Sequence, residues 1–375
     1  MVNILIISHY TEVPGVMDKV ALYLKNHKYS LCFVLNPLLP KSSLKSIIKS
    51  DKKEITYKIF YLFQYIFEGV VSITKYKSTN IKLVDFDIAI CFDPLSFLNT
   101  LIFKKLYKIK KIIYYNVDFS MGRFNNGIMN FIYLMADRFS YRKCDYFFYL
   151  TANQTKKIDP TNRFNEKAFL LKHTFNINSI NKNIKKIPKS IIFSGTLGYS
   201  VSFIDLFEAL KTIKRVGINF VFDIYGEGNQ KKQLEYYVDS SIIKNNVHFK
   251  GIVSNEVLIC EVLPKYSFGV CPYVTQVKNA VLSHIFTATD LTTKLVEYIA
   301  VGLPIISTRL TDFFNIIEAN NFGFIVKNKN DWYGALIKLL NDDDLLNNYS
   351  ENAFEYSKNY DEEKILTPIF DKILK

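Results

Sequence analysis

The chain has 375 residues, of which 49% are hydrophobic, and its formal net charge is +13. This length suits two domains that each bury their own core, and the hydrophobic content excludes a disordered chain. The five cysteines are odd in number, scattered and without Cys-x-x-Cys spacing. They exclude a disulfide framework and a structural zinc site, and they favour a reducing compartment.

The N-terminal segment MVNILIISHYTEVPG has no basic lead and no small-residue cleavage site, so it predicts a first core strand and not a signal peptide. The most apolar run, residues 59–73, is short for a bilayer span and contains Gln64 and Glu68. We therefore expect a cytoplasmic protein without a transmembrane helix.

Basic residues crowd the first half of the chain. They form two groups, Lys41, Lys45, Lys49, Lys52, Lys53 and Lys58, then Lys104, Lys105, Lys108, Lys110 and Lys111, with apolar residues between them at helical spacing. One interpretation is an amphipathic surface on an anionic membrane at the inner face of the cell. The other is the amino-acid bias of an AT-rich genome. No motif indicates nucleic acid as a partner.

Strand and helix signals alternate through the first half. Strands are predicted at 3–8, 30–35, 86–92, 111–116 and 145–151, and helices at 16–25, from about 36 to Thr74, and at 130–143. Buried apolar runs of this kind are typical of parallel strands. The alternation predicts a doubly wound α/β sheet.

The same pattern restarts after a polar stretch rich in Lys and Asn, with no sequence repeat between the halves. Strands are predicted at 190–193, 219–225, 247–250, 267–272 and 305–307, and helices at 203–216, 230–238, 293–301, 331–340 and 342–360. The sequence thus predicts an N-terminal domain at 1–176, a linker at 177–189 and a C-terminal domain at 190–360. A ligand is expected at the carboxyl ends of the strands.

Residues 292–307 combine features that suit a diphosphate. Thr292 or Thr293 can cap a helix, whose first N–H groups and dipole favour an anion. Lys294 adds a positive charge at the same end. Glu297, about one turn deeper, can accept two hydrogen bonds from a vicinal diol such as a ribose. The alternative is an exposed ion pair between Lys294 and Glu297.

The segment KLVEYIAVGLPIIST (294–308) resembles the signature of glycosyltransferase family 4, in which Lys-x-x-Glu precedes a small-residue helix and Gly-x-Pro. The resemblance implies a GT-B fold, with two Rossmann-like domains facing each other across a cleft. It also implies that Glu297 holds the ribose and that Thr293, Lys294 and Leu295 face the diphosphate, with Thr292 beside them.

Four neighbouring segments resemble the same family in order and spacing. They are FSGTLGYSVSFIDLFEAL (193–210), VFDIYGEGNQKKQL (221–234), VHFKGIVSNEVL (247–258) and FGVCPY (268–273). The resemblance places Gly195, Gly226, Gly228 and the turn at Gly251-Ile252 at the donor. Gly226 and Gly228 lack the third glycine of a dinucleotide fingerprint, which weighs against NAD. The resemblance covers residues 190–310 well and the first half loosely.

Two features depart from the family pattern. The first of the two usual glutamates is replaced by Thr289. Asp290 beside it is either a substitute for that glutamate or a simple helix-cap or loop residue. The usual Arg and Lys after the first glycine are absent, so we expect Thr196, Tyr199 and Ser200 to replace them and Lys294 to carry most of the leaving-group charge. Lys278 and His284 are further candidates for this charge or surface residues.

The first half offers candidates for the opposite side of the cleft. Glu12-Val13-Pro14-Gly15 resembles the loop that faces donor and acceptor, which makes Gly15 a donor-site candidate. Asp118 is our candidate for a catalytic group touching sugar or acceptor, with Asn116 second. Arg123 and Arg138 could bind an anionic acceptor, although a salt bridge to Asp137 or Asp145 is the favoured role for Arg138. His9 lies near the cleft or is a buried structural residue.

No metal or other cofactor is predicted. Asp85-Phe86-Asp87 imitates a metal-binding Asp-x-Asp motif but begins a strand, and Asp342-Asp343-Asp344 is expected to cap a helix. Helix dipole, backbone amides and Lys294 would then stabilise the leaving diphosphate.

The predicted function is a retaining, hexosyltransferase-type glycosyltransferase that moves a sugar from a nucleotide diphosphate sugar to a glycan, lipid-linked or protein acceptor. Family resemblance also predicts that a C-terminal helix, about 361–375, packs back on the first domain. Two alternatives remain open: a nucleotide-sugar 2-epimerase of the same fold, and a non-catalytic partner protein.

Overall fold

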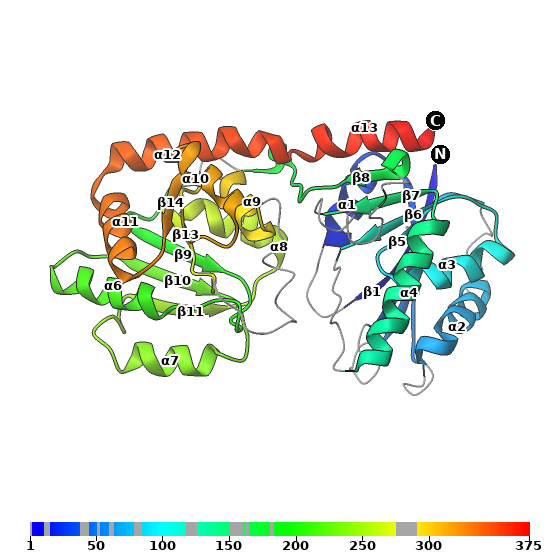
Figure 1. Ribbon diagram of the computed structural model, residues 1–375, viewed down its shortest axis with the longest axis horizontal. Helices are drawn as coiled ribbons and strands as arrows, with labels where there is room; N and C mark the ends of the chain where they lie inside the picture. The colour runs from blue at the N-terminus through cyan, green and yellow to red at the C-terminus, as the bar shows by residue number, and fades with distance from the viewer. Residues whose placement is uncertain are drawn as a thin grey trace. The chain divides into compact units, whose positions relative to one another are not determined.

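The computed structural model describes residues 2–10, 16–37, 45–50, 53–59, 64–78, 85–117, 126–150, 161, 165–180, 184–274 and 291–375. The chain divides into two compact units (Figure 1). The first consists of Met1–Lys172 together with Pro368–Lys375, and the second of His173–Thr367.

The first unit is built on a sheet with strand order β4-β3-β2-β1-β5-β6-β7-β8, parallel except for β3 and β4. Its elements are β1 (Asn3–Tyr10), α1 (Val16–Asn26), β2 (Ser30–Pro37), β3 (Ser46–Ser50), β4 (Glu54–Tyr57), α2 (Gln64–Ser78), β5 (Phe86–Cys91), α3 (Pro94–Leu106), β6 (Ile109–Asn116), α4 (Gly127–Lys143), β7 (Tyr146–Tyr149) and β8 (Ala168–Leu170).

Both faces of this sheet are covered, so its central strands are continuous apolar runs. Side chains on one face pack against α2, α3 and α4, where Tyr76, Phe97 and Tyr141 are buried. The opposite face meets α1 and the end of α13 (Glu362–Leu374), where the Phe370 ring lies 5.8 Å from that of Tyr23 and 6.2 Å from that of Phe148. The sheet thereby gains one core on each side.

The structure corrects the long helix predicted from about residue 36 to Thr74. Residues 46–50 and 54–57 form the antiparallel pair β3 and β4, and Ser50 N donates a hydrogen bond to Lys53 O at 2.8 Å. The two strands contain the β-branched residues Ile47, Ile48, Ile55 and Thr56, which favour strands. Helix α3 (Pro94–Leu106) was not predicted, although Asp93 and Pro94 form a good helix start.

The second unit holds a parallel sheet with strand order β11-β10-β9-β12-β13-β14. Its elements are β9 (Ser190–Ser194), α6 (Ile204–Arg215), β10 (Val221–Tyr225), α7 (Lys231–Asp239), β11 (Val247–Gly251), α8 (Asn255–Val257), β12 (Phe268–Cys271), α9 (Thr293–Ala300), β13 (Ile305–Thr308), α10 (Ile316–Ala319), β14 (Gly323–Val326), α11 (Lys329–Asn341) and α12 (Asp343–Ser357). The predicted cap is confirmed, since Asp342 accepts a hydrogen bond from Leu345 N at 2.8 Å.

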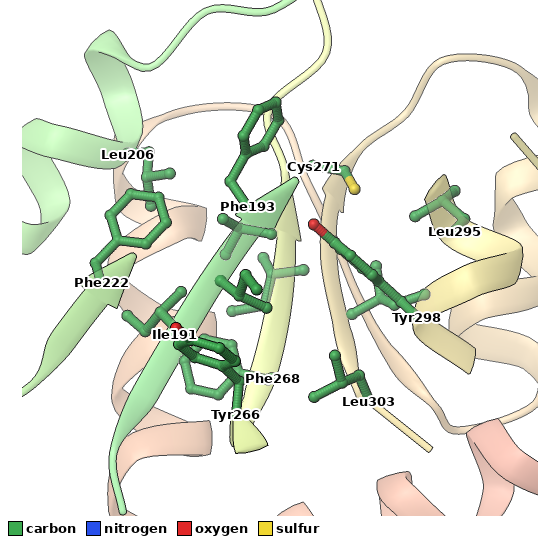
Figure 2. Close-up of a cluster of buried hydrophobic side chains, with 14 of the residues drawn as sticks. Ile191, Phe193, Leu206, Phe222, Tyr266, Phe268, Cys271, Leu295, Tyr298 and Leu303 are labelled. Carbon is green, nitrogen blue, oxygen red and sulfur yellow. The ribbon is translucent and has the colours of Figure 1, made fainter. Parts of the chain in front are cut away.

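Tyr298 links α9 to the central strands of this sheet. Its side chain is fully buried, and its hydroxyl accepts a hydrogen bond from Ser194 N at 2.8 Å. Figure 2 shows the hydroxyl end pointing away from α9, toward the strands that carry Phe193 and Cys271. A Cβ on Gly269 would lie 2.4 Å from the Tyr298 ring, so only glycine leaves room for it there. The start of α9 is thereby fixed beside the end of β9.

Each unit is a Rossmann-like doubly wound α/β layer structure, which confirms the predicted fold class. Among the described helices, none combines the length and apolar character needed to cross a bilayer.

Candidate functional site

The strand order of the second unit defines where a ligand is expected. The chain runs outward from β9 through β10 to β11, and then outward in the other direction from β12 through β13 to β14. The topological switch point therefore lies between β9 and β12. Ligands of open α/β sheets bind outside the carboxyl ends of the strands at this point.

Lys294 lies at this switch point. Its Nζ is 3.8 Å from the centroid of the Phe193 ring on β9 and 5.2 Å from that of Tyr273, which follows β12. A Cβ on Gly195 would lie 2.8 Å from the same Nζ. Burial lowers the pKa of Lys294 to about 8. Two aromatic faces therefore hold a cation where the strand order reverses.

The ion pair between Lys294 and Glu297, considered from the sequence, is not formed. Within the described part of the chain no carboxylate oxygen lies within 4.0 Å of Lys294 Nζ, and Glu297 is buried with 6% of its surface exposed. Glu297 does not pair with Lys294, but its charge still favours the charged form of the lysine. The ammonium group is therefore available to an anionic ligand.

The first turn of α9 adds backbone donors beside Lys294. Thr292 is the N-cap, with φ −68° and ψ 159°, but its side chain makes no capping hydrogen bond. Its Oγ1 lies 2.8 Å from the Tyr273 hydroxyl instead, and Thr293 Oγ1 lies 3.1 Å from His173 Nδ1. The first N–H groups of a helix have no acceptor within it, so this end of α9 suits a phosphate.

The glycine turns predicted at the donor come together. A Cβ on Gly226 would lie 1.9 Å from Gly195 O, and a Cβ on Gly228 would lie 2.3 Å from Leu197 O. Gly226 N also donates to Gly251 O at 2.7 Å. The loops after β9, β10 and β11 therefore pack backbone against backbone, which requires glycine at 226 and 228.

Other predicted donor residues differ in exposure. Thr196, Tyr199 and Ile252 are exposed and Gly251 is half-buried, so all lie at the surface near these loops. The side chain of Leu295 is buried in the core, so Leu295 can reach a ligand only through its backbone N–H.

Several predicted residues lie outside the described residues. They are Gly15, Asp118 and Asp290, together with Arg123, Lys278 and His284. The roles predicted for them stay predictions.

The first unit has its own switch point, between β1 and β5, and His9 lies there. Its Nδ1 is 2.9 Å from Asp93 Oδ2 and 3.1 Å from Ser96 Oγ, and its Nε2 is 2.9 Å from Glu68 Oε1. Asn99 Nδ2 donates to the same Glu68 oxygen at 2.7 Å. The imidazole therefore joins the end of β1 to α2 and to the start of α3.

The electrostatics of this cluster favour a charged histidine. Burial disfavours the charge, but the ion pairs and hydrogen bonds with Asp93 and Glu68 outweigh it and raise the pKa of His9 to about 10. Asp93 also caps α3 by accepting from Ser96 N at 2.9 Å, and its own pKa is lowered despite its burial. Of the two roles considered for His9, the geometry matches the buried structural one.

Asn116 and Arg138 have different surroundings. Asn116 is buried, and its Nδ2 donates to Asp137 Oδ1 at 2.7 Å. The salt bridge expected for Arg138 is absent: among the described residues, neither Asp137 nor Asp145 is within 4.0 Å of its guanidinium. Asp137 is buried with Tyr114 and Asn116 instead, and Asp145 accepts from Ile112 N.

Sequence reasoning missed the aromatic side chains around Lys294. Phe193 and Tyr273 lie in segments that resemble the family, but large aromatic residues of this kind are usually core residues. The neighbouring residues in sequence do not indicate that either ring faces a cation. No sequence motif surrounds His173, so nothing in the sequence indicates its contact with Thr293.

No group of three or more His, Cys, Asp and Glu side chains suited to a metal ion occurs in the described ranges. In the Asp85-Phe86-Asp87 motif, Asp87 accepts from Asn3 N at 2.9 Å and pairs with Lys110 at 2.7 Å. This carboxylate therefore anchors the amino end of β5.

Known proteins show the same architecture. Residues 175–356 match the family model of glycosyl transferases group 1. The fold is similar to sucrose-phosphate synthase from Thermosynechococcus elongatus (TM-score 0.70, 12% identity, 99% of this chain and 98% of that one) and to HepE of Anabaena in complex with UDP (TM-score 0.65, 11% identity, 99% of each chain). It is also similar to WaaG, a glycosyltransferase involved in lipopolysaccharide biosynthesis (TM-score 0.58, 14% identity, 99% of each chain). No curated protein matches the sequence.

The protein therefore has a GT-B fold with two doubly wound units. In the second unit, the Lys294 ammonium group and the start of α9 lie at the switch point of the sheet. Most of the second unit, residues 175–356, matches the model of glycosyl transferases group 1, while identity to the similar structures named above is only 11–14%. The predicted resemblance to GT-B glycosyltransferases is thereby confirmed, whereas the resemblance to family 4 in particular stays a prediction.

Proposed function

We propose that the protein transfers a sugar from a nucleotide diphosphate sugar to a hydroxyl of a glycan, lipid-linked or protein acceptor. The observation that carries this proposal is the position of Lys294. Its ammonium group is held between two aromatic rings and against Gly195, at the switch point, without a carboxylate within 4.0 Å in the described part of the chain. A diphosphate is the anion that this position and the start of α9 suit.

Each donor-side residue has a chemical role in this proposal. Lys294 and the N–H groups of Thr293 and Leu295 bind the diphosphate and stabilise the charge that develops on it as it leaves. Glu297 accepts hydrogen bonds from the ribose hydroxyls. Gly195 and Gly226 bring their backbones close to the phosphates.

The reaction that we propose retains the anomeric configuration. The bond between the anomeric carbon and the phosphate oxygen breaks, and the acceptor oxygen bonds to the same face of that carbon. The leaving phosphate takes the acceptor proton, so no protein base is required. Asp118 is proposed to contact the sugar or acceptor, and no metal ion is required by this scheme.

UDP-sugars are the first donors to test, because HepE, which has a similar fold, was solved with UDP. The experiment incubates the protein with UDP-, GDP-, ADP- and TDP-sugars and measures nucleotide release with and without candidate acceptors. We expect release from one donor class, and its loss in Glu297→Gln but not in the control Glu351→Gln on exposed α12.

Two outcomes would replace the proposal. Formation of an isomerised sugar without any acceptor would identify a 2-epimerase. Failure to bind any of the four nucleoside diphosphates would indicate a non-catalytic protein, in agreement with the missing basic pair after Gly195. Normal turnover by Glu297→Gln would show that the assigned site is wrong.

A further inference from the structure

Helix α4 of the first unit carries an apolar row on its solvent side. Ile128, Phe131, Ile132, Met135 and Phe139 are between 41% and 72% exposed, although each is large and apolar. Their spacing of three and four residues places them on one face of the helix. Met129, also exposed, adjoins the row.

The opposite side of α4 explains why this row cannot be part of the core. Asp137, Ser140 and Tyr141 are buried there, and Tyr141 packs on Phe147 of β7 with ring centroids 4.5 Å apart. The helix already uses this face to cover the sheet beside α3 (Figure 1). An apolar row on the remaining face marks an interaction surface, since monomeric proteins rarely expose contiguous apolar patches.

Basic residues lie at the C-terminal end of this row. Arg138 lies beside the row and, within the described residues, forms no ion pair with Asp137 or Asp145. Arg142 and Lys143 are exposed in the last turn of α4. Lys104 and Lys105 are exposed in the last turn of the neighbouring α3. Because α3 and α4 both lead from one parallel strand to the next, their last turns lie at the same edge of the sheet.

The net positive charge of the chain comes entirely from the first unit, which contains α4. Residues 1–172 and 368–375 contain 28 Lys and Arg against 14 Asp and Glu, a formal charge of +14. Residues 173–367 contain 20 against 21, a formal charge of −1. A uniform compositional bias toward lysine would charge both units, so the asymmetry favours an anionic partner of the first unit.

We propose that the exposed face of α4 lies in the headgroup region of an anionic lipid bilayer. Ile128, Phe131, Ile132, Met135 and Phe139 insert below the phosphates, while Arg138, Arg142 and Lys143 contact the phosphates. An apolar row bordered by basic side chains is the pattern of helices that lie in a membrane interface. A second copy of the chain fits less well, because two such faces would bring their cationic borders together.

The test is sedimentation of the full chain with lipid vesicles. Wild-type protein should bind vesicles of phosphatidylcholine mixed with phosphatidylglycerol, and should bind pure phosphatidylcholine weakly. The double variant Phe131→Gln/Ile132→Gln should lower the partition coefficient about tenfold or more, because it removes two exposed apolar side chains. Arg142→Gln/Lys143→Gln should lower it about tenfold on the anionic vesicles only.

The matched control is Leu22→Gln, an exposed apolar residue of α1 on the opposite face of the same sheet, which should bind as wild type. Unchanged thermal unfolding shows that each variant is folded. The proposal is overturned if the wild-type protein does not bind anionic vesicles or if the Phe131→Gln/Ile132→Gln variant binds them as wild type does. It is also overturned if the wild-type protein is a dimer in solution and this variant is a monomer. Vesicle binding needs no nucleotide, so its outcome is independent of donor binding by the second unit.

Discussion

Gly195 and Lys294 are ninety-nine positions apart in the chain, yet a Cβ on Gly195 would lie 2.8 Å from both Cε and Nζ of Lys294. The glycine thus leaves the space that the lysine side chain fills. Since the ammonium group lies at the switch point of the second sheet, the size of residue 195 controls where the cation is held.

Gly195→Ala should therefore displace Lys294 and weaken nucleoside diphosphate binding at least about tenfold. It should also destabilise the second unit by about 1–3 kcal/mol, since Gly195 has φ +144°. Gly217→Ala is the control: φ is +82° but no atom lies within 4 Å of the added Cβ. This control should lose stability and retain affinity, as measured by calorimetric titration and chemical unfolding. Equal affinity loss in both variants would refute the steric role.

Donor binding should depend on the protonation of Lys294. Burial lowers its pKa to about 8, so the ammonium form prevails below that pH and is lost above it. We expect the affinity for UDP to be highest below pH 8 and to fall as the pH rises through 8. Lys294→Met should bind more weakly and show no such fall. Titration calorimetry from pH 7 to 9 checks this, and an identical pH profile in the variant would contradict it.

Tyr298→Phe removes the hydroxyl that accepts a hydrogen bond from Ser194 N at 2.8 Å. This leaves a buried N–H group without that acceptor, which costs about 1–3 kcal/mol. Urea unfolding of the second unit should report the loss. Because Tyr298 also links α9 to β9, affinity for UDP should decrease as well. A variant as stable as wild type would show that the bond contributes nothing.

His9→Gln should destabilise the first unit by about 3–5 kcal/mol, because Glu68 and Asp93 would keep their buried charges without the cation. The pKa of His9 is raised from 6.5 to about 10, so its contribution is full below pH 6.5 and disappears as the pH rises through 10. Wild type should lose stability between pH 7 and 10, whereas His9→Gln should change little. His27→Gln, which leaves the cluster intact, is the control for urea unfolding at each pH.

Much of the second unit could be predicted from the sequence because its signals are local. Buried strands, glycine turns and the start of α9 each depend on a few adjacent residues, so KLVEYIAVGLPIIST and the turn at Gly195 are enough to indicate the fold. The strands β3 and β4 could not be predicted, because the short apolar run around Ile47 and Ile48 fits either a strand or a buried helix. Pairing of β3 with β2 decides between them.

The side-chain surroundings of the site could not be predicted in the same way. The Phe193 and Tyr273 rings meet Lys294 only because β9 and β12 are adjacent in the sheet. Likewise, burial of Asp137 beside Tyr114 and Asn116 separates it from Arg138, its neighbour in sequence. The apolar row of α4 has the spacing of an ordinary core face, and only the packing of the helix shows which side is exposed.

The central claim is that Lys294 binds the diphosphate of a nucleotide, and calorimetric titration of UDP into wild type and Lys294→Met tests it most directly. Loss of a charge-assisted interaction should weaken binding about 10- to 100-fold, with unfolding temperature nearly unchanged. Lys338→Met on α11 serves as the control and should bind UDP as wild type does. Equal affinity of wild type and Lys294→Met would contradict the claim.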